Sequence, residues 1–243
     1  MRILILGGTG EASALVRGLL AHGARFAITL SLAGRTREPK AQAVPTRIGG
    51  FGGPEGLAAW LRQERTDLVI DATHPFAARI GANAARACAE TGTRLLAIRR
   101  PAWLPQAGDR WIPVPDMAVA ALALGPIPRR VFLTIGRQEV AAFAAAPQHD
   151  YVVRAIEPID LAVPRLTAIQ ARGPFDAAAE AAFLTEREIE VLVSKNSGGD
   201  ATAGKIAAAR GLGLPVVMVS RPAKPDVPSV PDAAAALAWI CAL

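Results

Sequence analysis

The sequence predicts an α/β protein in which two doubly wound parallel sheets carry helices on both faces. Three observations support this prediction. Short apolar runs alternate with helical patterns along the chain of 243 residues. A glycine-rich turn directly follows the first apolar run. A stretch rich in proline and tryptophan, residues 99–115, interrupts the alternation near the middle of the chain, which indicates a crossover between two domains.

The N-terminal residues contain the most informative motif. Residues 3–6 are an unbroken apolar run, which is typical of a strand buried on both faces, and residues 11–20 have a helical pattern. The turn that joins them contains Gly8, Thr9 and Gly10, and Glu11 opens the helix. Such a turn brings backbone N–H groups and a helix N-terminus close to a phosphate. Ser13 replaces the third glycine of the usual dinucleotide-binding fingerprint, and its small side chain still allows close packing.

The second strand, predicted over residues 26–32, indicates which dinucleotide would bind. An NAD-dependent enzyme carries an acidic residue at the carboxyl end of this strand, where it binds the ribose hydroxyls. This chain has Ser31 there, followed by Arg35. An arginine at this place suits the 2′-phosphate of NADP, and a solvated basic loop is the alternative. We therefore expect Ser31 and Arg35 to bind NADP.

The remainder of the first half continues the alternation. Residues 46–53 predict a short strand that runs into a glycine-rich turn, and residues 54–65 predict a helix with proline in its first turn. Residues 68–70 and 95–98 predict two further buried strands, separated by a helix over residues 76–91. Strands that alternate with helices in this way form parallel sheets.

The segment DATHPFA, residues 71–77, follows the carboxyl end of a predicted strand, where open α/β sheets bind their ligands. Thr73 offers a hydroxyl group to a cofactor. His74 offers an imidazole that titrates near neutral pH, so it is the candidate for proton donation or for a hydrogen bond to substrate. The alternative is a helix-capping loop in which the histidine has no chemical role.

The domain division predicted from this pattern is a first domain over residues 1–100, a linker over residues 101–115 and a second domain over residues 116–243. The second domain is expected to repeat the alternation. Its predicted strands are residues 130–135, 151–156, 168–171, 190–193 and 215–219. Its main predicted helices are residues 116–124, a segment that ends near residue 187, and residues 232–241. Asp116 is the expected N-cap of the first of these helices.

A second polar motif follows the predicted strand at residues 190–193. It gathers hydroxyls, an amide and ammonium groups at a helix N-terminus, which suits an anion. Its residues are Lys195, Asn196, Ser197, Gly198, Thr202 and Lys205. The order of a Walker motif is absent, and an ordinary polar turn with a helix cap at Asp200 or Thr202 is the alternative. Arg221, after the last predicted strand, is expected along the same rim.

The composition limits the ligand and the location. The net charge is +6, and most of the positive charge comes from arginine, which pairs well with carboxylates and phosphates. A small polyanion fits the dispersed arginines better than nucleic acid does, because the sequence has no nucleic-acid-binding motif. Two cysteines and three scattered histidines form no metal-binding pattern. Neither a membrane span nor a targeting peptide is evident, so a cytoplasmic protein is expected.

Several motifs together resemble one known family. They are LILGGTGEA, SLAGRT after the second strand, DATHPFA, the IGR segment around Arg137, SKNSGG with Thr202 and Lys205, and VVMVSRP. These segments resemble the precorrin-6A reductase family of cobalamin biosynthesis. The likeness spans almost the whole chain, and DATHPFA and SKNSGG are specific to that family.

The resemblance implies two Rossmann-like domains with the active site in the cleft between them. It also implies NADPH-dependent reduction of the C18=C19 double bond of precorrin-6A, which gives precorrin-6B. The first domain would hold NADPH through the glycine turn with Glu11, and through Ser31, Arg35 and Thr73. The second would bind the carboxylates of the tetrapyrrole through Arg137, Arg154, Lys195, Asn196, Ser197, Gly198, Thr202 and Lys205. Neighbouring enzymes of the corrin pathway are candidate partners.

Alternatives stay open from the sequence alone. The cobalt-containing form of the substrate fits equally well, since the metal-free and cobalt routes use similar reductases. Another NADP-dependent reductase or epimerase would need a Tyr-x-x-x-Lys pair, but Tyr151, the single tyrosine, is followed four residues later by Ala155. A non-catalytic NADP-binding regulator is a further alternative. The proton for C18 could come from His74, from water or from the substrate itself.

Overall fold

The computed structural model consists of two compact units, and each contains a six-stranded parallel sheet. The structure describes residues 1–34, 42–137, 139–159, 161–171 and 173–243. Unit 1 comprises Met1–Pro101 and Pro222–Leu243, and unit 2 comprises Ala102–Arg221. The predicted α/β class with two parallel sheets is therefore confirmed. Among the described residues, no helix is both long enough and apolar enough to cross a membrane.

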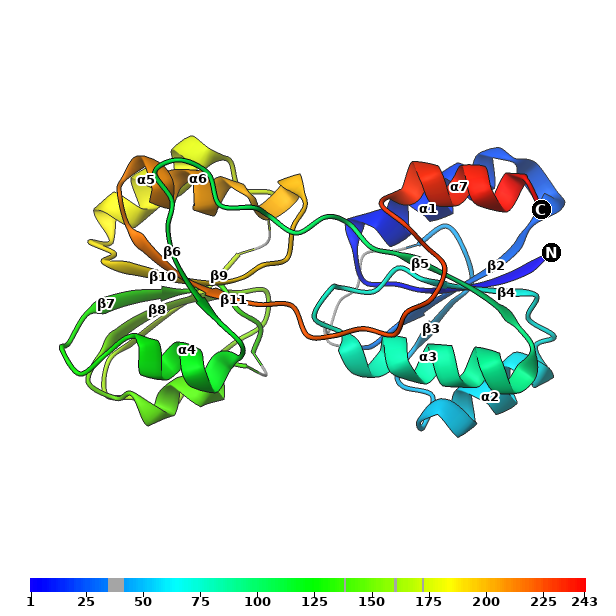
Figure 1. Cartoon of the computed structure of the whole chain (residues 1–243), viewed down its shortest axis with the longest axis horizontal. Helices are drawn as coiled ribbons and strands as arrows, with labels where there is room; N and C mark the ends of the chain where they lie inside the picture. Colours follow the sequence, from blue (N-terminus) through cyan, green and yellow to red (C-terminus); the bar gives the residue numbers. More distant parts are fainter. Residues whose placement is uncertain (35–41, 138, 160, 172) are drawn as a thin grey trace. The chain divides into compact units, whose positions relative to one another are not determined.

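Unit 1 has the strand order β12-β5-β4-β1-β2-β3. Its strands are β1 (Arg2–Leu6), β2 (Ala27–Leu32), β3 (Thr46–Ile48), β4 (Leu68–Asp71), β5 (Arg94–Ile98) and β12 (Ser229–Val230). Its helices are α1 (Gly10–Ala21), the short 3-10 helix η1 (Gly23–Arg25), α2 (Pro54–Gln63), α3 (Ala78–Thr91) and α7 (Ala233–Cys241). Helices α1 and α7 cover one face of the sheet, and α2 and α3 cover the other (Figure 1).

The apolar run of β1 explains why this strand is central. Ile3 and Ile5 pack into the cluster beneath α1 and α7, whereas Leu4 and Leu6 pack beneath α2 and α3. Alternate side chains of a strand point to opposite faces, so a strand covered by helices on both faces must be apolar at every position. Burial of each such side chain stabilises the fold by about 1.5–3 kcal/mol.

Unit 2 has the strand order β6-β11-β10-β7-β8-β9. Its strands are β6 (Arg110–Val114), β7 (Arg130–Leu133), β8 (Asp150–Ala155), β9 (Leu166–Gln170), β10 (Val191–Lys195) and β11 (Pro215–Val219). Its helical segments are α4 (Met117–Ala123), η2 (Val140–Ala145), α5 (Ala177–Glu186), η3 (Asp200–Thr202) and α6 (Gly204–Gly211). Asp116 caps α4 as predicted, because its Oδ1 accepts the Val119 N–H at 2.9 Å.

The predicted linker over residues 101–115 needs correction, because β6 lies within it. This strand forms one edge of the sheet in unit 2 and pairs with β11. Pro113 lies in β6, opposite Met218 in the register of the two strands. An edge strand has a neighbour on one side only, so it tolerates the missing N–H of a proline. Pro113, one of the prolines that indicated a linker, is thus compatible with a strand.

The predicted second domain over residues 116–243 is also wrong at its C-terminal end. Residues 222–243 belong to unit 1, where Ser229 of β12 pairs with Ala97 of β5. Helix α7 follows and packs against α1, and Ala236 and Ile240 are fully buried in the core of unit 1. The apolar face of this helix shows that it packs on a sheet, but its sequence does not show which of the two sheets it joins.

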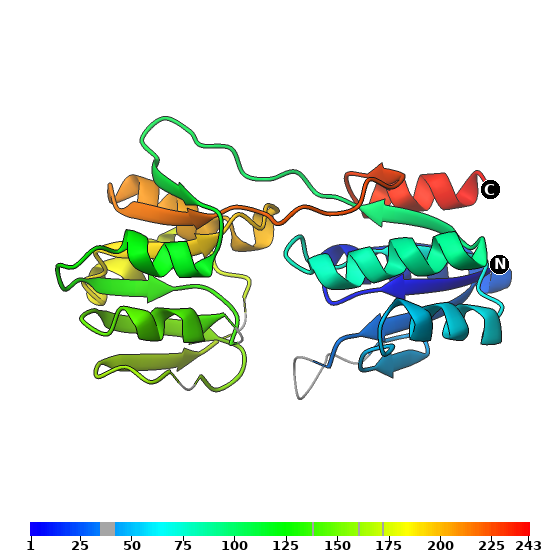
Figure 2. The same ribbon diagram turned by 60° about the horizontal axis from the view of Figure 1, so that its bottom comes forward.

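The two sheets have matching topologies. In chain order, β1 to β5 and β7 to β11 occupy corresponding positions, and each set has the order 3-2-1-4-5. The sixth position is taken by β12 in unit 1 and by β6 in unit 2. The chain therefore leaves unit 1 before its sheet is complete and returns to supply the last strand, and both chain ends lie in unit 1 (Figure 2).

Candidate functional site

The first candidate site lies at the carboxyl ends of β1 and β4 in unit 1. The chain leaves β1 toward α1 on one face of the sheet and leaves β4 toward α3 on the other face. Loops that follow two such strands diverge and leave a crevice, which is where open α/β sheets bind ligands. A small hollow occupies this place. It is lined by Thr9, Glu11, Ala72, Thr73, Pro75, Ile98 and Arg100.

The glycine turn between β1 and α1 has the shape that a phosphate needs. Gly8 has a φ of +103°, a conformation that favours glycine. A Cβ atom added to Gly8 or Gly10 would meet no atom within 4 Å, so there is open space over the turn. At Gly7 an added Cβ would lie 2.6 Å from Leu30 Cδ1, so this glycine allows the turn to pack on β2. The turn therefore fits the pyrophosphate of a dinucleotide.

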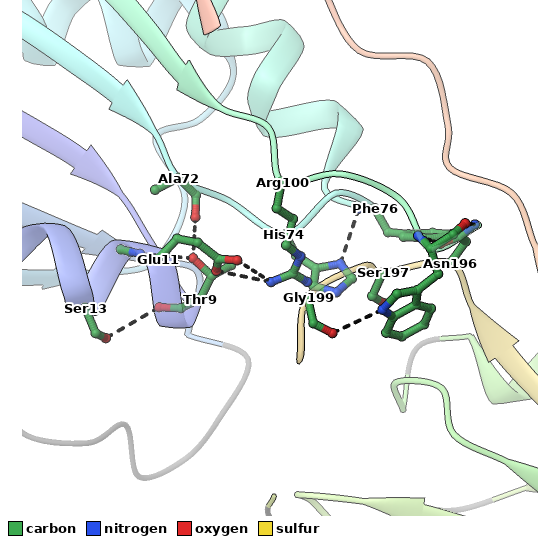
Figure 3. A network of polar contacts seen from close by, with 12 residues as sticks. Thr9, Glu11, Ser13, Ala72, His74, Phe76, Arg100, Asn196, Ser197 and Gly199 are labelled. Carbon is green, nitrogen blue, oxygen red and sulfur yellow. Dashed lines mark hydrogen bonds and ion pairs between the residues drawn. The ribbon is translucent and has the colours of Figure 1, made fainter. Parts of the chain in front are cut away.

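Thr9 fastens the glycine turn to the loop that follows β4. Its hydroxyl donates to the Ala72 carbonyl oxygen at 2.7 Å and accepts the Ala12 N–H at 3.2 Å as the N-cap of α1 (Figure 3). Ser13 donates from Oγ to the Thr9 carbonyl at 3.4 Å. With its hydroxyl engaged in this way, Thr9 presents backbone rather than side chain to a ligand.

Glu11 and Arg100 form an ion pair beside the turn. Arg100 Nη1 lies 2.8 Å from Glu11 Oε1 and 3.1 Å from Oε2 (Figure 3). Burial by itself raises the pKa of Glu11, but the hydrogen bond and charge of Arg100, with backbone and Thr9 hydrogen bonds, hold that pKa below its ordinary value. Glu11 is thus an ionised carboxylate whose charge is balanced by Arg100. The sequence reasoning missed Arg100, which lies two residues after the end of β5 and directly before Pro101.

A buried ionic cluster holds the DATHPFA loop. Asp71 is 1% exposed, and its Oδ2 lies 2.8 Å from Arg99 Nη2 and 3.8 Å from Lys224 Nζ. Thr73 donates to Asp71 Oδ1 from its hydroxyl at 2.5 Å and from its N–H at 3.1 Å, and Lys224 donates to Thr73 Oγ1 at 3.2 Å. The Thr73 hydroxyl proton is therefore engaged, so this residue can only accept a hydrogen bond from a ligand.

The charges around Asp71 decide its protonation state. Burial alone would raise its pKa, but Lys224 and Arg99, with hydrogen bonds from Thr73 and Arg99, lower the pKa below the ordinary value. The sequence reasoning missed Lys224 because it lies 151 positions from Thr73 along the chain.

The contacts of His74 define its tautomer. Its Nδ1 accepts the Phe76 N–H at 3.2 Å (Figure 3). The ring proton of the neutral imidazole therefore lies on Nε2, so His74 can donate a hydrogen bond from that atom. To act as an acid, His74 would also need a proton on Nδ1, which would then oppose the Phe76 N–H. The catalytic role predicted for His74 stays a prediction, and this geometry favours hydrogen bonding over proton transfer.

Ser31, one of the two residues predicted to select NADP, lies near the carboxyl end of β2. Ser31 is buried, and its Oγ accepts from Arg47 Nη1 at 3.0 Å. Arg35 lies outside the described residues, so its predicted role stays a prediction.

In unit 2, the SKNSGG loop follows β10 and is fastened from several sides. Asn196 clamps the backbone of Trp103, since its Oδ1 accepts the Trp103 N–H at 2.8 Å and its Nδ2 donates to the Trp103 carbonyl at 3.0 Å. Arg221 donates to the carbonyls of Asn196 at 2.8 Å and Ser197 at 2.9 Å, which confirms that it lies along this loop. Lys195 Nζ lies 2.8 Å from Glu139 Oε1.

A second set of charged residues lies within unit 2. Arg154 makes a two-pronged contact with Glu180 at 2.6 and 2.8 Å, and its guanidinium lies 3.7 Å from the Phe175 ring centre. Lys205, the second residue of α6, lies with Nζ 5.7 Å from the centre of the Trp103 ring. Burial lowers the pKa of Lys205 to about 8. Because Arg154 is paired with Glu180, Lys205 carries the less compensated charge of the two.

The remaining predicted residues of unit 2 differ in exposure. Arg137 and Thr202 are exposed, and Gly198 is buried with a φ of +64°. Helix α6 begins at Gly204 and has no side-chain cap, so the alternative in which Asp200 or Thr202 caps a helix is not observed.

Comparison with known proteins identifies the family. A family model described as "Precorrin-6x reductase CbiJ/CobK" matches residues 2–241. A precorrin-6A reductase of a Sinorhizobium species is 56% identical over 94% of this chain and 88% of its own length. A precorrin-6A reductase of Rhodobacter capsulatus is 50% identical over 92% of this chain and 89% of its own. A solved structure described as CobK precorrin-6A reductase is 47% identical, with a TM-score of 0.94 over 100% of this chain and 96% of that chain.

The chain belongs to the precorrin-6x reductase family. This membership confirms the resemblance seen in the sequence motifs and makes the chain an oxidoreductase of a family from cobalamin biosynthesis. A reductase with a dinucleotide-type glycine turn is consistent with a nicotinamide cofactor.

The structure brings predicted site residues together in two groups, one in each unit. Unit 1 brings together the predicted Thr9, Glu11 and Thr73 around one hollow. The SKNSGG residues of unit 2 share a loop with Arg221. The residues that sequence reasoning missed, Arg100 and Lys224, hold the unit 1 group in place through ion pairs with Glu11 and Asp71. An Arg–Pro pair follows each of two strands, Arg100-Pro101 after β5 and Arg221-Pro222 after β11. This repeated pair is the sequence signal that could have indicated Arg100.

Proposed function

We propose that this chain catalyses the NADPH-dependent reduction of the C18=C19 double bond of precorrin-6A, which gives precorrin-6B. The observation that carries the proposal is the glycine turn of unit 1, open above Gly8 and Gly10, in a chain of a reductase family. When bound, NADPH would supply the hydride for C19, and C18 would take a proton, for which His74, water and the substrate itself are the candidate sources. The chain supplies binding, orientation and charge.

The metal-free substrate is favoured over its cobalt form by the relatives. Those named precorrin-6A reductase are 44–56% identical to this chain. Those named cobalt-precorrin-6A reductase, such as the protein of Salmonella typhimurium, are 26–30% identical. The chain is thus more similar to the first group along nearly its full length.

The residues of unit 1 hold the cofactor in this proposal. The backbone around Gly8 and Gly10 binds the pyrophosphate with the N-terminus of α1. Arg100 balances the carboxylate of Glu11, which would otherwise repel the phosphates. The Thr73 hydroxyl accepts a hydrogen bond from a ribose hydroxyl, since its own proton is directed to Asp71. Ser31 and Arg35 bind the 2′-phosphate.

The residues of unit 2 bind the acetate and propionate carboxylates of the tetrapyrrole. Lys205 supplies a buried positive charge and Arg137 an exposed one. Lys195 is held by Glu139, and the side chain of Asn196 is engaged with Trp103, so these two, with Ser197, Gly198 and Thr202, shape the loop that faces the substrate. Arg154 supports Lys205 indirectly, because its pairing holds Glu180 nearby. In unit 1, His74 is the candidate for a hydrogen bond to the substrate.

The experiment that tests this proposal measures oxidation of the reduced nicotinamide in the presence of precorrin-6A. NADPH and NADH are compared, and cobalt-precorrin-6A is run beside the metal-free substrate. We expect turnover with NADPH, weak use of NADH, and loss of that preference in Arg35→Ala. Tight NADPH binding without turnover of either substrate would contradict the proposed reaction and leave the cofactor assignment standing.

A further inference from the structure

Arg47 stands at the end of the sheet where the adenosine half of a dinucleotide is expected. It lies in β3 and faces Ser31 of β2 in the register of the two parallel strands. Its Nη1 donates to Ser31 Oγ at 3.0 Å. A guanidinium has no acceptor, so Ser31 receives this hydrogen bond and keeps its own hydroxyl proton for another partner. In dinucleotide-binding units, the end of the second strand meets the ribose 2′ group.

The guanidinium of Arg47 is held in a fixed orientation. It donates to the carbonyls of Gly49 and Gly50, both at 2.9 Å, and it stacks 3.7 Å from the centre of the Phe51 ring. Trp60 supports that ring by an edge contact with a centroid separation of 5.7 Å. These bonds leave further N–H groups of the guanidinium for a ligand. Because the Arg47 side chain is already ordered, little conformational entropy is lost when a ligand binds to it.

The charge of Arg47 is not balanced by a carboxylate among the described residues. Arg62, Arg86, Arg99 and Arg100 of the same unit each pair with an acidic side chain at 2.8–3.1 Å, and no such pair exists for Arg47 in the part of the chain that the structure describes. Burial lowers the pKa of Arg47, as expected for a cation without a counter-charge. A half-buried, oriented guanidinium favours an anion, and a phosphate monoester matches its planar fork.

The glycine-rich turn after β3 leaves room for that anion. Gly49 and Gly52 have φ values of +111° and +79°. A Cβ atom added at Gly49, Gly50 or Gly52 would meet no atom within 4 Å. The backbone can therefore approach a ligand closely beside Arg47.

We propose that Arg47 and the hydroxyl of Ser31 bind the 2′-phosphate of NADPH and make the enzyme prefer NADPH over NADH. This inference rests on the proposed use of a nicotinamide cofactor. It gives Ser31 a partner within the described residues and gives the glycine-rich turn after β3 a role in cofactor selection.

Binding of nucleotide fragments tests the proposal without the tetrapyrrole. The probes are 2′,5′-ADP, which carries the 2′-phosphate, and 5′-AMP, which lacks it, and both are titrated calorimetrically against the full chain. In Arg47→Met, affinity for 2′,5′-ADP should fall about ten- to hundredfold, as for loss of hydrogen bonds to a charged group. Affinity for 5′-AMP should change less than about threefold. Arg62→Met, which removes an exposed arginine paired with Glu90, is the control and should leave both affinities unchanged.

The outcomes separate a phosphate-binding role from a structural one. An equal fall for both fragments in Arg47→Met would show that Arg47 only shapes the turn, and it would overturn the proposal. If Arg47→Met does not fold, Arg47→Lys is used in its place, since lysine keeps the charge but loses the planar guanidinium. The quantity compared is the ratio of the affinities for 2′,5′-ADP and 5′-AMP. A ratio equal to that of the wild type would overturn the proposal. If the wild type binds neither fragment nor NADPH, the proposed cofactor use itself fails. A wild type that binds NADPH but shows no preference for 2′,5′-ADP rejects only the 2′-phosphate site.

Discussion

At the scale of single residues, Lys205 combines a binding role with a cost to stability. The side chain is 9% exposed, and burial lowers its pKa from 10.5 to about 8. The positive charges of Arg154 and Lys195 act in the same direction, and Glu180 opposes them. The ammonium is therefore charged at neutral pH but loses its proton far more easily than an exposed lysine.

We expect Lys205→Met to stabilise unit 2 at neutral pH by on the order of 1–3 kcal/mol while weakening substrate binding. Proton linkage gives the direction of the pH dependence. Between pH 8 and 10.5 Lys205 is protonated in the unfolded chain but not in the folded protein. The free energy of unfolding of the wild type therefore increases as pH rises through this window. Urea unfolding at neutral and alkaline pH measures both effects. In the wild type, kcat/KM should fall above about pH 8. A Lys205→Met variant with unchanged KM would contradict the binding role.

Asp71 makes the opposite contribution, because its pKa is lowered in the folded state. Its charge stabilises the fold at neutral pH, and this stabilisation is lost as pH falls through the lowered pKa, below the ordinary value of 3.8. Asp71→Asn leaves the charges of Arg99 and Lys224 uncompensated, so we expect a loss of about 2–4 kcal/mol in the free energy of unfolding at neutral pH. Denaturant unfolding checks this, with the exposed Asp226→Asn as control. An Asp71→Asn protein as stable as that control would refute the role of the cluster.

At the scale of elements, a substitution where the glycine turn meets α1 is expected to affect stability and cofactor affinity in different directions. Gly10 is the first residue of α1, and its φ is not positive, so alanine fits the backbone there. We expect Gly10→Ala to keep or raise stability, by up to about 1 kcal/mol, because the unfolded chain loses freedom.

The same methyl group enters the space over the turn, where the phosphates approach. NADPH affinity in Gly10→Ala should therefore fall by roughly tenfold or more, measured by calorimetry. Gly211→Ala, at the end of α6 with equally open surroundings, is the matched control and should leave NADPH affinity unchanged. Full NADPH affinity in Gly10→Ala would place the pyrophosphate elsewhere.

Sequence reasoning worked best where local chemistry determines an element. The buried strands, the cap at Asp116 and the turn before α1 follow from patterns a few residues long, and the structure confirms them. It failed for β6, because prolines at an edge strand resemble those of a linker. It also missed Arg47, whose partner Ser31 lies 16 positions away along the chain and becomes a neighbour only when β2 and β3 pair.

At the scale of the whole molecule, the chain passes from unit 1 to unit 2 after Pro101 and returns after Arg221. These two connections determine which fragments of the chain can fold alone. Residues 102–221 contain every strand of their sheet, whereas residues 1–101 lack β12 and α7. Without α7, the buried side chains of α1, including Leu19, lose their cover. The position of residues 222–243 was not predictable from sequence, since both sheets have a matching place for a sixth strand.

We expect a fragment of residues 102–221 to unfold cooperatively and a fragment of residues 1–101 to be unstable. Joining residues 222–243 through a flexible linker to the front of residues 1–101 should restore a folded unit 1 that binds NADPH. Circular dichroism during thermal unfolding and NADPH titration measure the two properties. A stable, NADPH-binding fragment of residues 1–101 alone would show that β12 and α7 are dispensable.

Unit 1 is formed from two separate segments of the chain, and this also affects how it folds during translation. Translation adds about 5–20 residues per second, so on the order of ten seconds separate the emergence of β5 from that of β12. During this interval β5 is an uncovered sheet edge of a nascent polypeptide, able to pair with foreign strands. Unit 2 receives its own last strand, β11, before β12 is synthesised. The first domain to be synthesised is therefore the last to be completed.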